Sequence, residues 1–214
     1  MARSPDVSPL FVGAEIKFRK LSRASRLLLT FGDRIAATSS QVDLTWSASA
    51  GAASYQIERK AAGGGFTLLQ SVTGTTYSDT AVGANLAYVY RVRAVAGSSF
   101  SPYSNMDLAT TIIYTNDPLA AGIVVAGWHF EQLRTAVNAI RSTAGLSAAV
   151  WSSPSPLPSK VIKRADLVEL RDRLHEARTA LGLSSGAYTV DPSITALVTT
   201  IKRQHVQELL ERTR

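Results

Sequence analysis

The chain has no cysteine, which excludes disulfides and thiolate metal sites. It has no run of 18 apolar residues, so no transmembrane helix is expected. The apolar stretch 27–31 is shorter than the core of a signal peptide, which needs roughly 7–15 residues. Residues 1–33 are therefore predicted to be a basic leader, either poorly structured or the start of a fragment.

Signatures of common enzymes are also missing. The glycine run 63–65 joins two predicted strands and lacks the Lys-Ser/Thr pair of a phosphate-binding loop. A Gly-x-Ser-x-Gly match at 182–186 follows a predicted helix, whereas a nucleophile elbow follows a strand. No pair of carboxylates is placed across a cleft, as a glycosidase requires. No cofactor-binding motif is present, and we lean towards a chain that is not an enzyme.

Positive charge is in excess and is unevenly placed, with a formal net charge of +7. Residues 1–40 carry seven basic and three acidic side chains, whereas residues 41–114 carry four of each. A basic balance can indicate binding to nucleic acid or to an anionic surface, here through residues 1–32. Because the remaining excess falls on predicted solvent-facing helix positions, we interpret it mainly as solvated charge.

The middle of the chain alternates with a period of two, which is the pattern of half-buried strands. Apolar and polar residues alternate in 42–46, 55–59 and 88–95, and turn residues separate these runs. With a short strand near Arg34, residues 34–112 are predicted to hold seven strands. Short strands with turns about every 8–12 residues are typical of an antiparallel β-sandwich.

These residues resemble a fibronectin type III domain. The matching pieces are Val42–Trp46, Ala53–Arg59, Thr75–Thr80, Tyr88–Val95 and Ser101–Asn105. Tyr88, with Val82 before it, resembles the tyrosine corner of that family. The resemblance implies a sandwich over residues 34–112 that acts as a spacer or a binding platform. The candidate ligand-binding residues on it are Phe66, Phe100 and Tyr103.

The rest of the chain repeats itself, because residues 125–146 and 162–183 are similar at an offset of 37. Each copy has an apolar stripe with the spacing of one helix face. Gly145 and Gly182 follow the stripes, at the place of a C-terminal helix cap. A third, truncated copy occupies 201–214. The repeat predicts units that bury their apolar faces on one another.

One apolar helix face cannot offset the cost of ordering a whole helix, so the helices are expected to pack together or on the sandwich. After a linker at 113–122, residues 123–214 are predicted to form a small three-helix repeat bundle. Its helices are expected near 127–144, 165–181 and 203–213. Trp151 and Tyr188 follow the first two helices, where we expect them to bridge neighbouring helices; ligand binding is the alternative.

This segment is similar to a repeat found at the C-terminal ends of large secreted proteins of soil bacteria. In that pattern an aromatic residue and Thr-Asp-Pro precede Ile-Lys-Ala and His-Ile-x-Glu-Leu-Arg. The matching pieces are Tyr188–Pro192, Ile201–Leu210 and Ile162–Arg171. The resemblance covers residues 119–214 and implies a secreted, modular bacterial protein, without implying an activity.

His129, Asp166 and His205 share one position of the repeat, in the predicted first turn of each helix. A carboxylate there caps the helix and interacts favourably with its dipole, whereas we expect the histidines to lie at the surface or in packing positions. His205 and Glu208 are one turn apart and are the candidate metal ligands, although HExxH spacing is absent. We favour capping or surface roles and assign no metal.

The leading functional hypothesis is a non-catalytic, extracellular bacterial module that binds polysaccharide, a cell surface or another protein, or acts as a spacer. One alternative is a glycan-active hydrolase with its site between the sandwich and the bundle. Its candidate catalytic residues are His129, Glu131, Asp166 and His175. The other alternative, nucleic-acid or anionic-surface binding through residues 1–32, is the least favoured.

Overall fold

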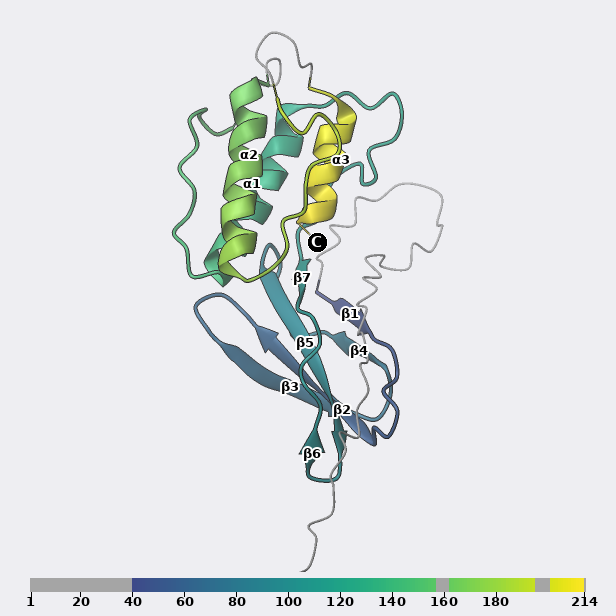
Figure 1. Ribbon diagram of the computed structural model, residues 1–214. Coiled ribbons are helices and arrows are strands. Elements are labelled where there is room, and N and C mark those ends of the chain that lie inside the picture. Colours follow the sequence, from purple (N-terminus) through teal and green to yellow (C-terminus); the bar gives the residue numbers. More distant parts are fainter. Residues whose placement is uncertain (1–39, 157–161, 195–200, 214) are drawn as a thin grey trace, which may run out of the picture.

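The computed structural model describes residues 40–156, 162–194 and 201–213, in which antiparallel strands are followed by three helices (Figure 1). The smaller sheet pairs β1 (Val42–Thr45) with β4 (Thr76–Asp79). The larger sheet consists of β3 (Phe66–Val72), β2 (Ser54–Lys60), β5 (Ala87–Ala96), β6 (Ser99–Phe100) and β7 (Asp107–Thr110), with β6 and β7 both paired to β5. The strand predicted near Arg34 lies outside the described residues.

An apolar core fills the space between the two sheets. Its buried members are Val42, Leu44, Trp46, Tyr55, Ile57, Val82, Tyr88, Tyr90, Val92, Ala94 and Ala109. The hydroxyl of Tyr88 accepts a hydrogen bond from the N–H of Gly83 at 2.9 Å, a contact typical of a tyrosine corner. The buried carboxylate of Asp79 accepts hydrogen bonds from Arg59 at 2.7 Å and from Tyr90 at 2.9 Å. This buried charge is thus hydrogen-bonded, as burial requires.

The helices α1 (Gly127–Thr143), α2 (Arg164–Ala180) and α3 (Arg203–Arg212) stand beside one another at one end of the larger sheet (Figure 1). Their bounds fall within one residue of the predicted ranges. A second core joins their apolar faces to Ala87 and Val89 of β5 and to Leu108 of β7. Strand β5 is therefore buried on both sides, because its alternate residues Tyr88 and Tyr90 face the core between the two sheets.

Hydrogen bonds join the C-terminal ends of two helices to the sheet. The hydroxyl of Thr143, at the end of α1, donates to the carbonyl of Ala87 at 2.8 Å. The hydroxyl of Thr110 in β7 donates to the carbonyl of Thr213, just beyond α3, at 2.7 Å. The hydroxyls of Thr213 and Tyr114 lie 2.6 Å apart. All these groups are buried, so the helices are held to the sheet by directional contacts as well as by apolar packing.

Residues 113–122, predicted to be a linker, pack closely against the helices. Tyr114 and Leu119 are buried in the second core. The N–H of Leu119 donates to the side chain of Gln207 in α3 at 2.9 Å. Gln132 of α1 donates to the hydroxyl of Thr115 at 2.9 Å. The connection between strands and helices is therefore held to both α1 and α3. No helix of the described residues is long and apolar enough to cross a membrane.

Candidate functional site

The shared repeat position at the start of each helix is occupied by a capping side chain. Nδ1 of His129 and Nδ1 of His205 each accept the backbone N–H three residues earlier, at 2.9 and 3.0 Å. The carboxylate of Asp166 accepts the equivalent N–H at 2.7 Å. All three side chains are buried, and burial lowers the pKa of His129, which keeps its imidazole neutral and able to accept. All three residues therefore cap their helices. For the two histidines the sequence had predicted a surface or packing position instead of a cap.

The candidate metal ligands His205 and Glu208 are engaged in protein contacts. Nε2 of His205 lies 2.9 Å from the carboxylate of Asp191. Glu208 accepts hydrogen bonds from the N–H and the hydroxyl of Thr189 at 2.7 and 3.0 Å. Arg171 lies 3.8 Å from the other oxygen of Glu208. The described residues hold no cluster of three or more side chains suited to a metal ion.

The four candidate catalytic residues are separated by other contacts. Arg134 lies between Glu131 and Asp166, at 3.1 and 3.7 Å from their carboxylates. His129 caps its own helix, as described above. His175 is exposed on α2 and lines a different surface. In the part of the chain that the structure describes, these residues do not converge on one cleft.

Three candidate ligand-binding aromatics come together on the outer face of the larger sheet. The guanidinium of Arg91 lies 4.1 Å from the ring centre of Phe66 and 3.8 Å from that of Tyr103. The guanidinium of Arg93 lies 4.1 Å from the ring centre of Phe100 and 4.9 Å from that of Tyr103. Rings and cations thus alternate in the order Phe66, Arg91, Tyr103, Arg93 and Phe100. We call this row the arginine–aromatic ladder.

The polar groups of the ladder are paired with one another and with β2. Glu58 accepts hydrogen bonds from Arg91 at 2.7 Å and from the hydroxyl of Tyr103. Burial alone would raise the pKa of Glu58, but the hydrogen bonds from Tyr103 and Arg91 hold it below its ordinary value. Arg93 donates two hydrogen bonds to the side-chain oxygen of Gln56, at 3.0 and 2.7 Å. The ladder therefore connects β2 to β5 and to Tyr103, and it leaves few of its polar groups for a ligand.

The two repeated aromatics of the connectors also stack on arginines. Arg134 lies 5.0 Å from the ring centre of Trp151. Arg171 and Arg212 lie 4.1 and 4.3 Å from the ring centre of Tyr188. The residue after each aromatic donates its N–H to a glutamate of the next helix, at 3.1 and 2.7 Å. Each aromatic connector thus contacts the helix before it and the helix after it.

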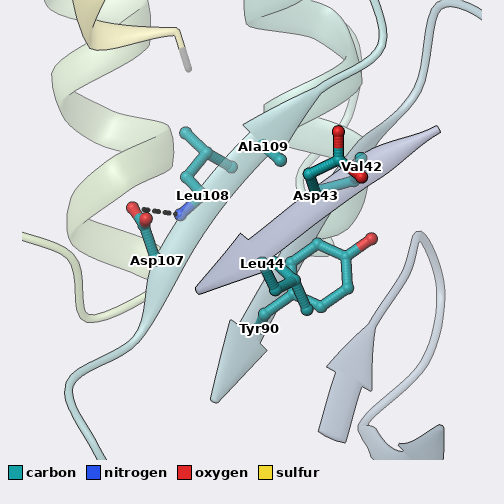
Figure 2. A pocket seen from close by; sticks show the side chains of 7 residues that line it. All are labelled: Val42, Asp43, Leu44, Tyr90, Asp107, Leu108 and Ala109. Atoms are coloured by element: carbon teal, nitrogen blue, oxygen red, sulfur yellow. Dashed lines mark hydrogen bonds between the residues drawn. The ribbon is translucent and has the colours of Figure 1, made fainter. Parts of the chain in front are cut away.

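A small hollow lies between β1 and β7 (Figure 2). It is lined by Val42, Asp43, Leu44, Tyr90, Asp107, Leu108 and Ala109. Its volume of about 10 Å³ leaves room for about one water molecule. The carboxylate of Asp107 turns towards the N–H of Leu108, which donates to it at 2.9 Å (Figure 2). The hollow is too small for an organic ligand.

A larger groove lies between α2 and residues 186–194, with a volume of about 540 Å³. Small-molecule sites usually measure roughly 300–1,000 Å³. The groove is lined by Arg164, Val168, Arg171, Asp172, His175, Gly186, Ala187, Tyr188, Pro192, Ser193 and Ile194. His175 and Tyr188 were predicted separately, as a candidate catalytic and a candidate ligand-binding residue, and the structure brings both to this groove. Their proximity arises because the connector returns alongside α2, which no local pattern in the sequence reveals.

Comparisons with known proteins match part of this chain. No family model matches the chain. An amylopullulanase of Thermoanaerobacterium saccharolyticum is 33% identical over 118 residues, which cover 52% of this chain and 8% of that protein. A solved Fn3-like protein from Clostridium thermocellum is 32% identical over 34% of this chain and 77% of its own, with a TM-score of 0.31. The fn3 domain of the human collagen alpha-1(XX) chain is 24% identical over 37% of this chain and 79% of its own, with a TM-score of 0.32. Both of these solved structures are described as fibronectin type III domains or as similar to them.

Proposed function

We propose that the chain is a non-catalytic, secreted module that binds polysaccharide and spaces the parts of a larger protein. Its units would be a fibronectin type III-like sandwich over residues 34–112 and a three-helix repeat bundle over 123–214. The observation that carries this proposal is the single core that unites the larger sheet with all three helices. Such a core favours a rigid spacer, because separate domains joined by a free linker would move independently.

The use of the charged groups supports a module without catalysis. Catalytic acids and bases need a reachable position and a tuned pKa. Here Asp166 caps a helix and Glu131 is paired with Arg134. Glu58 is paired within the ladder and Glu208 within a connector. Because these four side chains are already paired within the chain, we expect a ligand to be recognised by other surface residues.

Polysaccharide is the favoured ligand class because a curated relative is an enzyme named for its action on polysaccharide. That protein is an amylopullulanase, and this chain spans only 8% of its length. The matched region is therefore a small part of a modular enzyme. Pullulan is the first polysaccharide to test, followed by insoluble starch, cellulose and chitin.

The test measures binding and hydrolysis with the same purified chain. Affinity electrophoresis in gels containing pullulan should retard the protein, and pull-down with insoluble polysaccharides should extend the comparison. A reducing-end assay on the same substrates should show no hydrolysis. Retardation without hydrolysis supports the proposal. Hydrolysis that a point substitution abolishes without unfolding the chain would overturn the proposal. Binding to none of the tested polysaccharides would also overturn it.

A further inference from the structure

The floor of the groove is one face of α2. Arg164, Val168, Asp172 and His175 recur along the helix at intervals of three or four residues, so they form a single row. At a rise of about 1.5 Å per residue, this row is about 16 Å long. The opposite wall is the connector that carries Tyr188. A groove of this length, open to solvent, fits an elongated ligand better than a compact one.

Several polar side chains in the groove are free to bind. Asp172, His175 and Ser193 form no hydrogen bond or ion pair with any other described residue. Arg164 donates from Nε to the carbonyl of Ile194 at 2.7 Å, and its terminal nitrogens bind none of the described side chains. This differs from the arginine–aromatic ladder, where the polar groups are paired. The groove therefore offers both hydrogen-bond donors and acceptors to a ligand.

The equivalent place in the first repeat is closed. Asn138 stands 37 positions before His175, and its side chain accepts the N–H of Ala149 at 2.9 Å. This contact fastens the first connector to α1. In the second repeat the N–H of Gly186 donates to Ser184 at 3.3 Å, and His175 makes no contact of this kind with the connector. The groove is thus open in the second repeat, where His175 stands at the position that Asn138 occupies in the first.

The closed first copy lacks these charged groups. Gly127 and Thr135 occupy the positions of the first repeat that correspond to Arg164 and Asp172. In the third copy Arg203 and Glu211 occupy these positions, but both are hydrogen-bonded within the chain, Arg203 to the carbonyl of Leu119 and Glu211 to the side chain of Gln207. The second copy thus differs from both others in combining an open connector with charged side chains that keep free hydrogen-bonding groups among the described residues.

The mixture of donors and acceptors suits a ligand rich in hydroxyl groups. Each hydroxyl both donates and accepts, so it can pair with Asp172 and with Arg164. A phosphate or sulfate would face the carboxylate of Asp172, and a cation would face Arg164. Burial raises the pKa of Tyr188 to about 12, so its hydroxyl stays protonated at neutral pH.

We propose that the groove between α2 and residues 186–194 binds a linear oligosaccharide segment, whose hydroxyl groups pair with Asp172, His175 and Arg164. This inference rests on the proposed polysaccharide binding and assigns it a site. The arginine–aromatic ladder is then a stiffening element of the sheet. Binding in the groove would leave both apolar cores undisturbed.

His175 provides a direct reporter for this site. The chain has three histidines, and His129 and His205 are buried at 2% and 0% exposure. Titration with maltohexaose, followed by NMR of the imidazole groups, should move the signals of His175 saturably and leave those of His129 and His205 unchanged. Cellohexaose and chitohexaose should be titrated in parallel, and inorganic phosphate serves as the anionic probe.

The substitutions Asp172→Ala and His175→Ala should each weaken oligosaccharide binding about tenfold or more, as expected for the loss of hydrogen bonds to a ligand. Both residues are exposed, so the fold should be retained, and circular dichroism checks this. His175→Asn places in the second repeat the residue that closes the first and should also reduce binding. Thr135→Ala alters the matched position of α1 and should leave binding unchanged.

The outcomes separate the site from the function. If wild-type chain binds polysaccharide but the Asp172 and His175 variants bind equally well, the groove assignment is wrong and the proposed function stands. If phosphate moves the His175 signals and no oligosaccharide does, the groove is an anion site and the inference fails. If no polysaccharide or oligosaccharide binds at all, both the function and the site are refuted.

Discussion

The guanidinium of Arg91 lies 3.8 Å from the ring centre of Tyr103, and Glu58 binds both side chains. This relationship ties three segments of the larger sheet together, because Glu58 lies on β2, Arg91 on β5 and Tyr103 on the chain between β6 and β7. A planar cation can stack on a ring while donating to a carboxylate at its edge. The same guanidinium also covers Phe66 at 4.1 Å.

Replacing Arg91 with lysine should destabilise the chain by about 1 kcal/mol. The ammonium of lysine keeps the charge but loses the flat stacking on two rings, each contact being worth about 0.5–1 kcal/mol at a partly exposed site. Urea unfolding followed by circular dichroism measures the change in the free energy of unfolding. The control is Arg173→Lys on the exposed face of α2, which should change that free energy by less than about 0.5 kcal/mol. Equal effects of the two substitutions would show that the ladder adds no stability.

Acid should weaken the start of α1. The pKa of His129 is lowered by burial, so the unfolded chain binds a proton there more readily than the folded chain. The contribution of His129 to the free energy of unfolding is therefore fully present at pH values well above the unfolded pKa, about 6.5. It is lost as pH falls through that value towards the lower pKa of the folded chain. Within this window the loss can reach about 1.4 kcal/mol per pH unit.

The matched variant for this effect is His129→Asp, which copies the capping residue of the second repeat. A carboxylate accepts the same N–H without losing its charge between pH 5 and 7.5. Urea unfolding at several pH values across that window should show a steeper loss of stability in wild type than in the variant. Parallel pH profiles for the two proteins would mean that His129 contributes nothing to the acid sensitivity.

Strands and helices should unfold together. Their shared core and the buried hydrogen bond from Thr143 to Ala87 couple α1 to β5. Thr143→Val removes the hydroxyl but keeps the shape, leaves a buried carbonyl without that donor, and should cost about 1–3 kcal/mol. Hydrogen exchange in increasing urea should show peptides of β2 and α2 losing protection at the same concentration, and both shifting together in the variant.

Thr143→Ser is the control for that experiment. Serine retains the donor and should cost less than valine, although it loses one methyl group. A transition of the helices at lower urea than that of β2 would show that the two parts unfold separately. In that case the coupling through β5 is too weak to make one cooperative unit.

The positions of the helices were predictable because the signals for them are local. The apolar stripe and the glycine after each helix lie within one segment, and Gly145 and Gly182 adopt positive φ angles of 77° and 71° there. The hydrogen bonds that close α1 and α2 connect Leu146 to Arg141 and Leu183 to Arg178 at 2.8 and 2.9 Å. Such caps depend on nearby residues alone.

The histidine caps were missed because local sequence rules rank imidazole poorly as a cap. A histidine accepts an N–H only when it is neutral, and burial among distant residues decides this for His129. The burial of Val89 could not be predicted either, because the alternation of the strand places this residue on the face opposite the core between the sheets. Only the docking of α1 shows that this outer face is a second buried surface.

The sequence by itself determined the alternation of the strands, the three helices, their C-terminal glycine caps and the candidate aromatics, because each depends on spacing within one segment. The tertiary structure decided which of these residues meet. It gathered Phe66, Tyr103 and Phe100 around two arginines, and it returned Tyr188 alongside His175. The physical reason is that such contacts join segments far apart in the chain, and their energy is realised only once the shared core has positioned those segments.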